Sequence, residues 1–251
     1  MSISSFFLSL FLLLSTFIST LAQANQANTP AADIISIYYH ERPPYYTADN
    51  GQIHGLVADP LIQAFLQAGI PFIWREIPAS RQLHMLENTE NASCAIGWFK
   101  TPEREQKFRY SAMLYRDRPT VVLTQRNNTA IKDGGKIADL LDNPTLIFLR
   151  KAGYSYGVFL DSFISSQKPE EYTTTVDNFH MLKMLEKNRA DYCFMAPEEA
   201  EDLLQHDKKL GAVLRIVELS DMPVGNERFL ICNQKVSADS LEKINSFIRE
   251  Q

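Results

Sequence analysis

GWFKTPEREQKFRYSAMLY, spanning Gly97–Tyr115, is the stretch that decides how this chain folds. An apolar strand-like run leads into a short polar turn, and a segment that carries Arg104 then leads into a second apolar run. This order places a guanidinium beside the carboxyl end of a strand, which is where open α/β sheets bind small ligands. Because a guanidinium presents a planar fork of donors that matches a carboxylate, Arg104 is a candidate carboxylate-binding residue. The alternative is a solvated arginine in a loop rich in charged residues.

Strands and helices alternate on the N-terminal side of this stretch. Asp59 as N-cap and Pro60 at the first helical position begin one helix, and Gly69 ends it. Apolar runs predict strands over 34–39, 71–77 and 94–98, with a second helix that begins at Ser80. The order βαβαβ predicts a parallel sheet covered by helices on both faces.

The same alternation restarts after a strand over 120–124 and the polar connector 125–128. The pattern then predicts strands over 145–149, 172–176, 192–195, 214–219 and 229–232, and helices over 154–164, 178–188, 197–205 and 238–249. Two copies of one plan, joined by polar connectors, predict two α/β lobes. Ligands are favoured at such a domain interface and at the carboxyl ends of strands.

The first 24 residues contain no charged side chain, are nearly all apolar over 6–18, and end in Ala22-Gln23-Ala24. This pattern predicts a secretory signal peptide, residues 1–24, that is cut before Asn25. An uncleaved anchor is the alternative, but a span needs roughly 20 apolar residues. The remainder is expected to be soluble and exported, without inserting into the membrane.

Charge and cysteine usage narrow the partners further. The formal net charge is −5, which argues against nucleic acid and acidic membrane surfaces as partners. Cys94, Cys193 and Cys232 lie in apolar strand-like runs and are interpreted as buried small hydrophobic residues. An oxidising compartment permits one disulfide, for which Cys94 and Cys232 are the pair to test. No metal-ligand spacing and no cofactor-binding motif is found in the sequence.

Four sequence motifs, taken in order, give the chain a resemblance to the family 3, amino-acid-type group of bacterial periplasmic solute-binding proteins, which are the receptors of ABC transporters. They are PPYY (43–46) followed by Asp49, Gly51, Gly55 and Asp59; GWFKTPERE with FRYSAMLY; AGYSYG (152–157); and ADYCFMAPEEA (190–200). The resemblance implies a type II fold, in which two lobes, each a mixed sheet flanked by helices, are joined by two crossing strands and close like a hinge. It assigns 34–123 plus 229–251 to lobe 1 and 127–224 to lobe 2, and implies a monomer in the periplasm.

The resemblance also implies a set of ligand-binding residues. Arg104 corresponds to the arginine that binds the ligand's α-carboxylate, with the backbone of Gly97 and Phe99 beside it. The loop after the first strand contributes Glu41, Arg42 and Tyr45, and lobe 2 contributes backbone N–H groups at Gly153, Tyr154 and Ser155. The aromatic residue that stacks on the ligand falls on Ala79, so Trp98 or Tyr45 would replace it. For Tyr154 and Ser155, a plain helix cap is the alternative interpretation.

One position departs from the pattern in a way that bears on the ligand. The lobe 2 carboxylate that pairs with a ligand ammonium falls on Ala196. Glu198 and Glu199 are near, but they lie in the first turn of a predicted helix, where acidic residues are common for dipole reasons. A buried ammonium without a carboxylate partner is unfavourable, which argues against a simple α-amino acid as ligand.

The sequence leaves three hypotheses about function. The first is a receptor that binds a small carboxylate-bearing, amino-acid-like solute between the lobes and delivers it to an ABC permease or a sensory receptor. The second is an enzyme on the same fold, a dehydratase of a cyclic prephenate-like acid, with Glu41 or Glu198 as general acid. The third is a structural or adhesive exported protein without a ligand.

Overall fold

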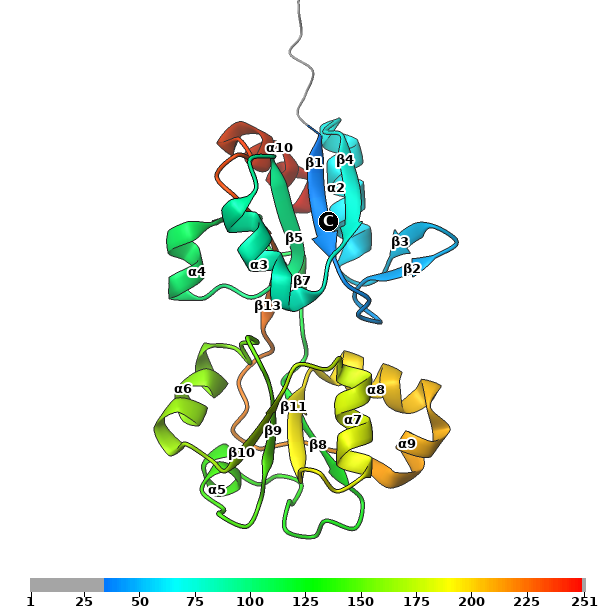
Figure 1. The fold of residues 1–251 in the computed structure, drawn as a ribbon, viewed down its shortest axis with the longest axis vertical. Helices are drawn as coiled ribbons and strands as arrows, with labels where there is room; N and C mark the ends of the chain where they lie inside the picture. Colours follow the sequence, from blue (N-terminus) through cyan, green and yellow to red (C-terminus); the bar gives the residue numbers. More distant parts are fainter. Residues whose placement is uncertain (1–33, 250–251) are drawn as a thin grey trace, which may run out of the picture. The chain divides into compact units, whose positions relative to one another are not determined.

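Lobe 1 is built on a six-stranded sheet whose strands come from both ends of the described chain (Figure 1). The computed structural model describes residues 34–249, and these belong to one compact unit. The strand order is β4 (Phe72–Glu76), β1 (Ile35–Tyr39), β5 (Ser93–Trp98), β13 (Glu227–Cys232) and β6 (Arg109–Tyr110), and β7 (Tyr115–Arg116) also pairs with β13. β4, β1 and β5 are parallel, whereas β13 is antiparallel to β5. The sheet is therefore mixed, as predicted.

Both faces of the lobe 1 sheet are covered by helices, because alternate side chains of a strand point to opposite sides. Ile37 of β1 packs in the cluster that includes α2 (Ala58–Ala68) and α10 (Ala238–Arg249), and Tyr38 packs on the other face with Leu86 of α3 (Ala79–Asn88). The hairpin β2 (Thr47–Asp49) and β3 (Gln52–His54) and the short helix α4 (Pro102–Lys107) complete the lobe.

Lobe 2 repeats the plan with a five-stranded sheet in the order β10 (Glu171–Thr174), β9 (Phe148–Lys151), β11 (Tyr192–Met195), β8 (Val121–Gln125) and β12 (Leu214–Val217). β10, β9 and β11 are parallel, and β8 is antiparallel to both of its neighbours. One face packs against α7 (Asn178–Glu186), α8 (Pro197–His206) and α9 (Lys208–Val213), and the other against α5 (Ile137–Leu141) and α6 (Val158–Gln167).

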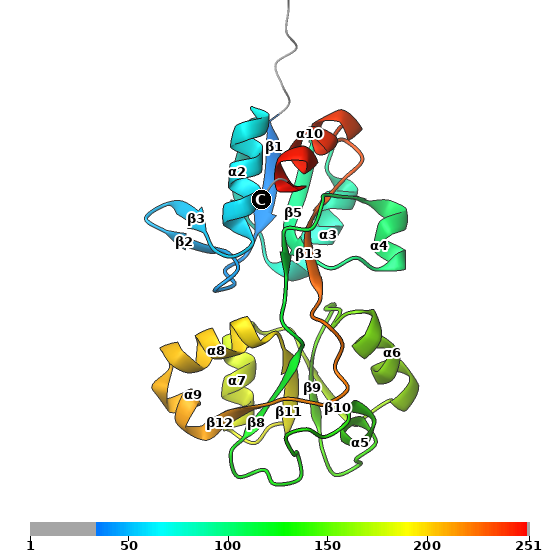
Figure 2. The same ribbon diagram turned by 180° about the vertical axis from the view of Figure 1, so that it is seen from behind.

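The chain crosses between the lobes twice, and the two crossing segments lie side by side (Figure 2). The first runs from β7 through Asp117 to β8, and the second approaches β13 through Gly225 and Asn226. Asp117 N donates to Asn226 O at 2.9 Å. A Cβ at Gly225 would lie 1.7 Å from Asp117 O, so only glycine allows the two backbones to come this close.

The sequence placed the first crossing one strand too late. Residues 121–123 were assigned to lobe 1, but they form β8, which pairs with β11 and β12 in the lobe 2 sheet. The polar stretch 125–128 is a turn that follows β8, with Asn128 N donating to Gln125 O at 3.1 Å. Apolar strands look alike in either sheet, so the composition of β8 alone did not indicate its partners.

Two further differences arise where local hydrogen bonds override the apolar pattern. The helix predicted over 154–164 begins at Val158, as α6, because Asp161 accepts hydrogen bonds from Ser155 Oγ and Tyr156 N and holds the preceding residues in a loop. Sequence reasoning also missed α4, although Thr101 is an N-cap that accepts from Arg104 N and Pro102 follows at the first helical position.

A disulfide joins Cys94 of β5 to Cys232 of β13, the pair named from the sequence. The two cysteines are register partners in neighbouring strands and are fully buried, and Cys193 is a buried free thiol. The bond therefore ties the first half of lobe 1 to the strand that returns from lobe 2, across a sequence separation of 138 residues.

We expect reduction of this disulfide to destabilise the protein by about 2–4 kcal/mol, because the cross-link limits the freedom of the unfolded chain. The melting temperature should then fall by about 4–16 °C, measured by calorimetry with and without reductant. A variant with both Cys94→Ala and Cys232→Ala should show no further response to reductant. A response of equal size in that variant would assign the effect to something other than this bond.

The predicted signal peptide lies outside the residues that the structure describes. Within residues 34–249, no helix has both the length and the apolar character to cross a membrane.

Candidate functional site

Arg104 is positioned at the carboxyl end of β5 by the start of α4. Its Nη1 donates to the backbone oxygen of Phe99 at 3.1 Å, and its Cζ lies 4.8 Å from the ring centroid of Trp98. Burial lowers the pKa of the guanidinium. Among residues 34–249, no carboxylate lies within ion-pair distance of it. Arg104 is thus a fixed, partly buried cation whose remaining donors are free of a protein anion.

A first compartment of about 380 Å³, which includes open solvent, lies in front of Arg104. It contains seven of the eight residues predicted from the sequence to bind ligand; the full lining is His40, Arg42, Tyr46, Gly97, Trp98, Phe99, Arg104, Tyr154 and Ser155. Gly97 has φ +80°, and a Cβ there would lie 2.6 Å from Cε1 of Tyr46. Glycine is therefore required at this point of the wall.

A second compartment of about 460 Å³, also open to solvent, shares the residues Arg42, Phe99, Tyr154 and Ser155 with the first. Its polar lining adds Asp117, Thr120, Lys151, Tyr156, Asn178, Glu199, Asn226 and Arg228. Lys151 Nζ donates to Asn178 Oδ1 at 2.8 Å and lies 4.3 Å from the ring centroid of Tyr154. Burial, with Arg42 as a further cause, lowers the pKa of Lys151 to about 8.

In the loop before α6, the side chains of Tyr154 and Ser155 have different roles: one contacts a residue across the compartment lining and the other stabilises the start of the helix. Ser155 Oγ donates to Asp161 Oδ2 and accepts from Gly157 N, so its side chain stabilises the start of the helix. The Tyr154 hydroxyl instead lies 3.2 Å from His40 Nε2, and both residues line the first compartment. Burial first, and then the nearby cation Arg42, lowers the pKa of His40 to about 3, so its imidazole is neutral.

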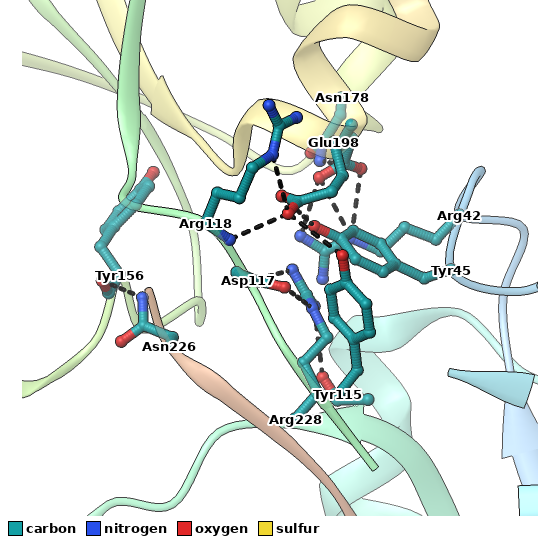
Figure 3. Close-up of polar contacts among 12 residues, drawn as sticks. Arg42, Tyr45, Tyr115, Asp117, Arg118, Tyr156, Asn178, Glu198, Asn226 and Arg228 are labelled. Atoms are coloured by element: carbon teal, nitrogen blue, oxygen red, sulfur yellow. Dashed lines mark hydrogen bonds and ion pairs between the residues drawn. The ribbon is translucent and has the colours of Figure 1, made fainter. Parts of the chain in front are cut away.

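Tyr45, the eighth predicted residue, does not line either compartment. It is fully buried in the lobe 1 core, with its ring centroid 3.7 Å from Arg228 Cζ and 5.6 Å from Arg42 Cζ. Its hydroxyl donates to Glu198 Oε2 at 3.4 Å (Figure 3). Tyr45 therefore lies behind the wall of the compartment, and the neighbouring Tyr46 lines it instead; adjacent positions of a loop are hard to separate by sequence.

Glu199, which sequence reasoning attributed to the helix dipole, forms a buried ion pair across the site. It is 2% exposed. Arg42 Nε lies 3.1 Å from its Oε1 and Arg42 Nη2 lies 3.0 Å from its Oε2. Asn178 Nδ2 donates to the same Oε1 at 2.6 Å. Arg42 therefore lies in the wall of the compartment, with its guanidinium paired to a carboxylate of the other lobe.

We expect this pair to make folding stability depend on pH in the acid range. Burial alone raises the pKa of Glu199, but the Arg42 guanidinium outweighs it and holds the pKa below its ordinary value. The stabilisation is therefore present above the unfolded pKa, about 4.3, and is lost as the pH falls through the folded value. Glu199→Gln should lower the free energy of unfolding by about 1.5–3 kcal/mol at pH 7, because the hydrogen bonds from Arg42 then lose their charged acceptor.

Melting temperatures measured from pH 7 to pH 3 check this expectation. The gap between the wild type and Glu199→Gln should close as the pH falls. A constant gap over the whole range would mean that the ionisation of Glu199 does not stabilise the fold.

Glu198, one of two candidate general acids, is engaged by groups from both lobes (Figure 3). Its Oε1 accepts from Tyr115 Oη at 3.2 Å and from Arg118 N at 2.9 Å. Glu41, the other candidate, accepts from Ala48 N at 2.9 Å. Neither is among the residues that line the two compartments. No acid proposed for the dehydratase hypothesis therefore faces the space in front of Arg104.

Arg228 and Asp117 form a second buried ion pair, which no sequence signal indicated. Arg228 Nε lies 2.6 Å from Asp117 Oδ1 and Nη2 lies 2.8 Å from Oδ2, and the residues are 0% and 3% exposed. Figure 3 shows the pair between the two crossing segments. Asn226 Nδ2 donates to Tyr156 O at 3.1 Å beside it. Over residues 34–249, no group of three or more His, Cys, Asp or Glu could hold a metal ion.

Residues 34–251 match the family model of the bacterial extracellular solute-binding proteins, family 3. No curated protein sequence matches the chain. Among solved structures, an ancestral arginine-binding protein bound to arginine has a TM-score of 0.69 and 18% identity, over 87% of this chain and 92% of that one. The holo form of ArgBP from T. maritima has a TM-score of 0.66 and 18% identity, over 87% and 90%. A putative L-cystine ABC transporter from Listeria monocytogenes has a TM-score of 0.67 and 16% identity, over 86% and 89%. These likenesses confirm the predicted type II two-lobed fold.

Proposed function

Since the chain belongs to the bacterial extracellular solute-binding proteins, family 3, we propose that it is a receptor for a small carboxylate-bearing solute, with Arg104 as the carboxylate clamp. The observation that carries this proposal is the state of Arg104. Its guanidinium is held between the Trp98 ring and the Phe99 carbonyl, faces the first compartment and has no carboxylate partner among the described residues.

A guanidinium in this state favours an anionic ligand for two physical reasons. A cation removed from water without a partner is unfavourable, so an anion that pairs with it gains a charge-assisted interaction. Because the side chain is already fixed by Trp98 and Phe99, little conformational freedom is lost when the ligand binds. The neutral His40 and the Tyr154 hydroxyl add uncharged donors or acceptors to the lining of the same compartment.

Contacts between the lobes provide the means by which binding could be signalled. Arg42 with Glu199, and Tyr45 and Tyr115 with Glu198, join side chains of lobe 1 to the first turn of α8 in lobe 2. A ligand that binds one arrangement of the lobes better than another shifts the population toward it. The protein in this favoured, ligand-bound arrangement would then dock, in the periplasm, on an ABC permease or a sensory receptor and deliver the solute to it.

A ligand screen with two readouts tests the proposal. The purified protein is mixed with amino acids, keto acids, hydroxy acids, dicarboxylates and aromatic carboxylates, each paired with a matched compound that lacks the carboxylate. A carboxylate should raise the melting temperature with the logarithm of its concentration, and its decarboxylated match should not. Tryptophan emission should respond as well, because Trp98 contacts Arg104, and Trp98→Phe should remove that response. If only compounds without a carboxylate stabilise the protein, the proposed clamp is wrong.

A further inference from the structure

The two compartments together are lined by more cationic than anionic side chains. Their linings contain four cationic side chains and two carboxylates: Arg42, Arg104, Lys151 and Arg228 against Asp117 and Glu199. His40 adds no charge, since burial and nearby cations hold its pKa far below neutrality. The walls therefore have a net charge of 4 − 2 = +2 at neutral pH.

Both carboxylates are already used by the other two cations. Asp117 pairs with Arg228 through two contacts of 2.6 Å and 2.8 Å. Glu199 pairs with Arg42 through Nε and Nη2 and also accepts from Asn178. Both are almost completely buried, so a new partner could reach them only by replacing one that is already bound.

The two cations that remain lie in different compartments. Arg104 lines the first, and Lys151 lines the second, where its ammonium donates to Asn178 and lies over the Tyr154 ring. Over residues 34–249, no carboxylate lies within ion-pair distance of the Lys151 ammonium. Tyr154 lines both compartments, so the two cations act on spaces that share a wall.

We propose that the solute is a dicarboxylate without an ammonium group, with one carboxylate on Arg104 and the other on Lys151. The inference rests on the proposed function, since it takes the Arg104 clamp as given. Two anionic groups neutralise the net charge of the walls. An ammonium would instead meet an excess of cations, because the two carboxylates that line these compartments are already paired with Arg42 and Arg228. The aromatic residues Phe99 and Tyr154, which line both compartments, suit the apolar part of the molecule between the carboxylates.

The test is a matched set of acids that varies the two features separately. Glutarate has two carboxylates, glutamate adds an ammonium, pentanoate has one carboxylate, and norvaline has one carboxylate and an ammonium. Succinate and adipate cover other spacings. Calorimetric titration of the purified protein should show a dicarboxylate binding at least about 10-fold more tightly than pentanoate, and the added ammonium of glutamate should weaken binding by at least about 10-fold.

Variants of Lys151 connect the preference to the proposed residue. Lys151→Gln should reduce the affinity for the best dicarboxylate at least about 10-fold and change that for pentanoate less than about threefold. Lys151→Arg keeps the charge and should retain the preference. Lys132→Gln, which removes an exposed lysine outside both compartments, is the matched control and should change neither affinity.

The outcomes separate the inference from the proposed function. If norvaline or another monocarboxylate binds as tightly as every dicarboxylate, or if Lys151→Gln leaves the preference unchanged in a folded protein, the inference is wrong while the Arg104 clamp stands. If no carboxylate of any kind binds, the clamp itself is wrong and the inference falls with it.

Discussion

Replacing Arg104 with alanine is expected to weaken carboxylate binding at least about 30-fold, which corresponds to ~2 kcal/mol or more. The variant removes the cation that faces the first compartment and leaves the ligand's carboxylate without its charged partner. Titration calorimetry with the best carboxylate from the screen measures the loss. Because Arg104 pairs with no carboxylate among residues 34–249, its removal strands no buried anion, and the melting temperature without ligand should change little.

Two further variants make this result specific. Arg104→Lys keeps the charge but loses the planar fork, and should recover only part of the affinity. Arg81→Ala removes an exposed arginine from α3 and should leave binding unchanged. An Arg104→Ala protein that binds carboxylates within about threefold of the wild type would contradict the clamp.

The position of Arg104 was predictable because its determinants are local. A strand that ends at Trp98 and a short polar turn precede Arg104 directly in the sequence, and they place the arginine beside the end of the strand even though the helix α4 was missed. Gly97 lies in the same stretch, and the structure places it in the wall of the same compartment with a φ of +80°. Seven of the eight predicted residues therefore line one compartment.

Glu199 was undervalued because its role depends on a residue 157 positions away in the sequence. The first turn of a helix is an ordinary place for a glutamate, and only the packing of the two lobes brings Arg42 to it. Tyr45 and Tyr46 were hard to separate for a related reason. PPYY offers two adjacent tyrosines, and the fold buries Tyr45 under Arg228 while Tyr46 lines the compartment.

The strand β8 shows what the sequence could not predict about the fold. Its run of buried apolar residues satisfied the pattern of a strand in either lobe, and its pairing with β11 and β12 depends on how the chain crosses. The disulfide pair was named from the sequence, but its reason appears only in the structure: β5 and β13 are neighbours, and their register places Cys94 opposite Cys232.

The two buried ion pairs have different parts in this molecule. Arg42 with Glu199 joins a loop of lobe 1 to the first turn of α8 in lobe 2 at the site, so it can respond to a ligand. Arg228 with Asp117 lies where the crossing segments are already linked by the backbone and where Gly225 allows no side chain. We therefore expect the pair Arg228–Asp117 to stabilise the crossing itself. Its loss should lower the stability of the fold more than it lowers the affinity for ligand.

Asp117→Ala is expected to destabilise the protein by about 3–5 kcal/mol, because it leaves the Arg228 guanidinium buried without a counter-charge. Arg228 is 0% exposed and its Cζ lies 3.7 Å from the Tyr45 ring and 5.0 Å from the Phe99 ring, so the guanidinium is held among packed aromatic side chains when its carboxylate is lost. The melting temperature should fall by about 6–20 °C, and the urea midpoint should fall with it. Both are measured without ligand, so that binding does not mask the change.

The double variant Asp117→Ala with Arg228→Met distinguishes a stranded charge from lost packing. Replacing both members of a buried pair with apolar groups is often neutral, so the double variant should regain most of the stability lost by Asp117→Ala. Glu90→Ala removes one partner of an exposed pair with Lys235 and should leave the melting temperature unchanged. If Asp117→Ala melts within about 2 °C of the wild type, the pair does not maintain the crossing. If the double variant is less stable than the single one, the attraction between Arg228 and Asp117 outweighs the unfavourable burial of both charges, and this pair differs from those that apolar groups can replace.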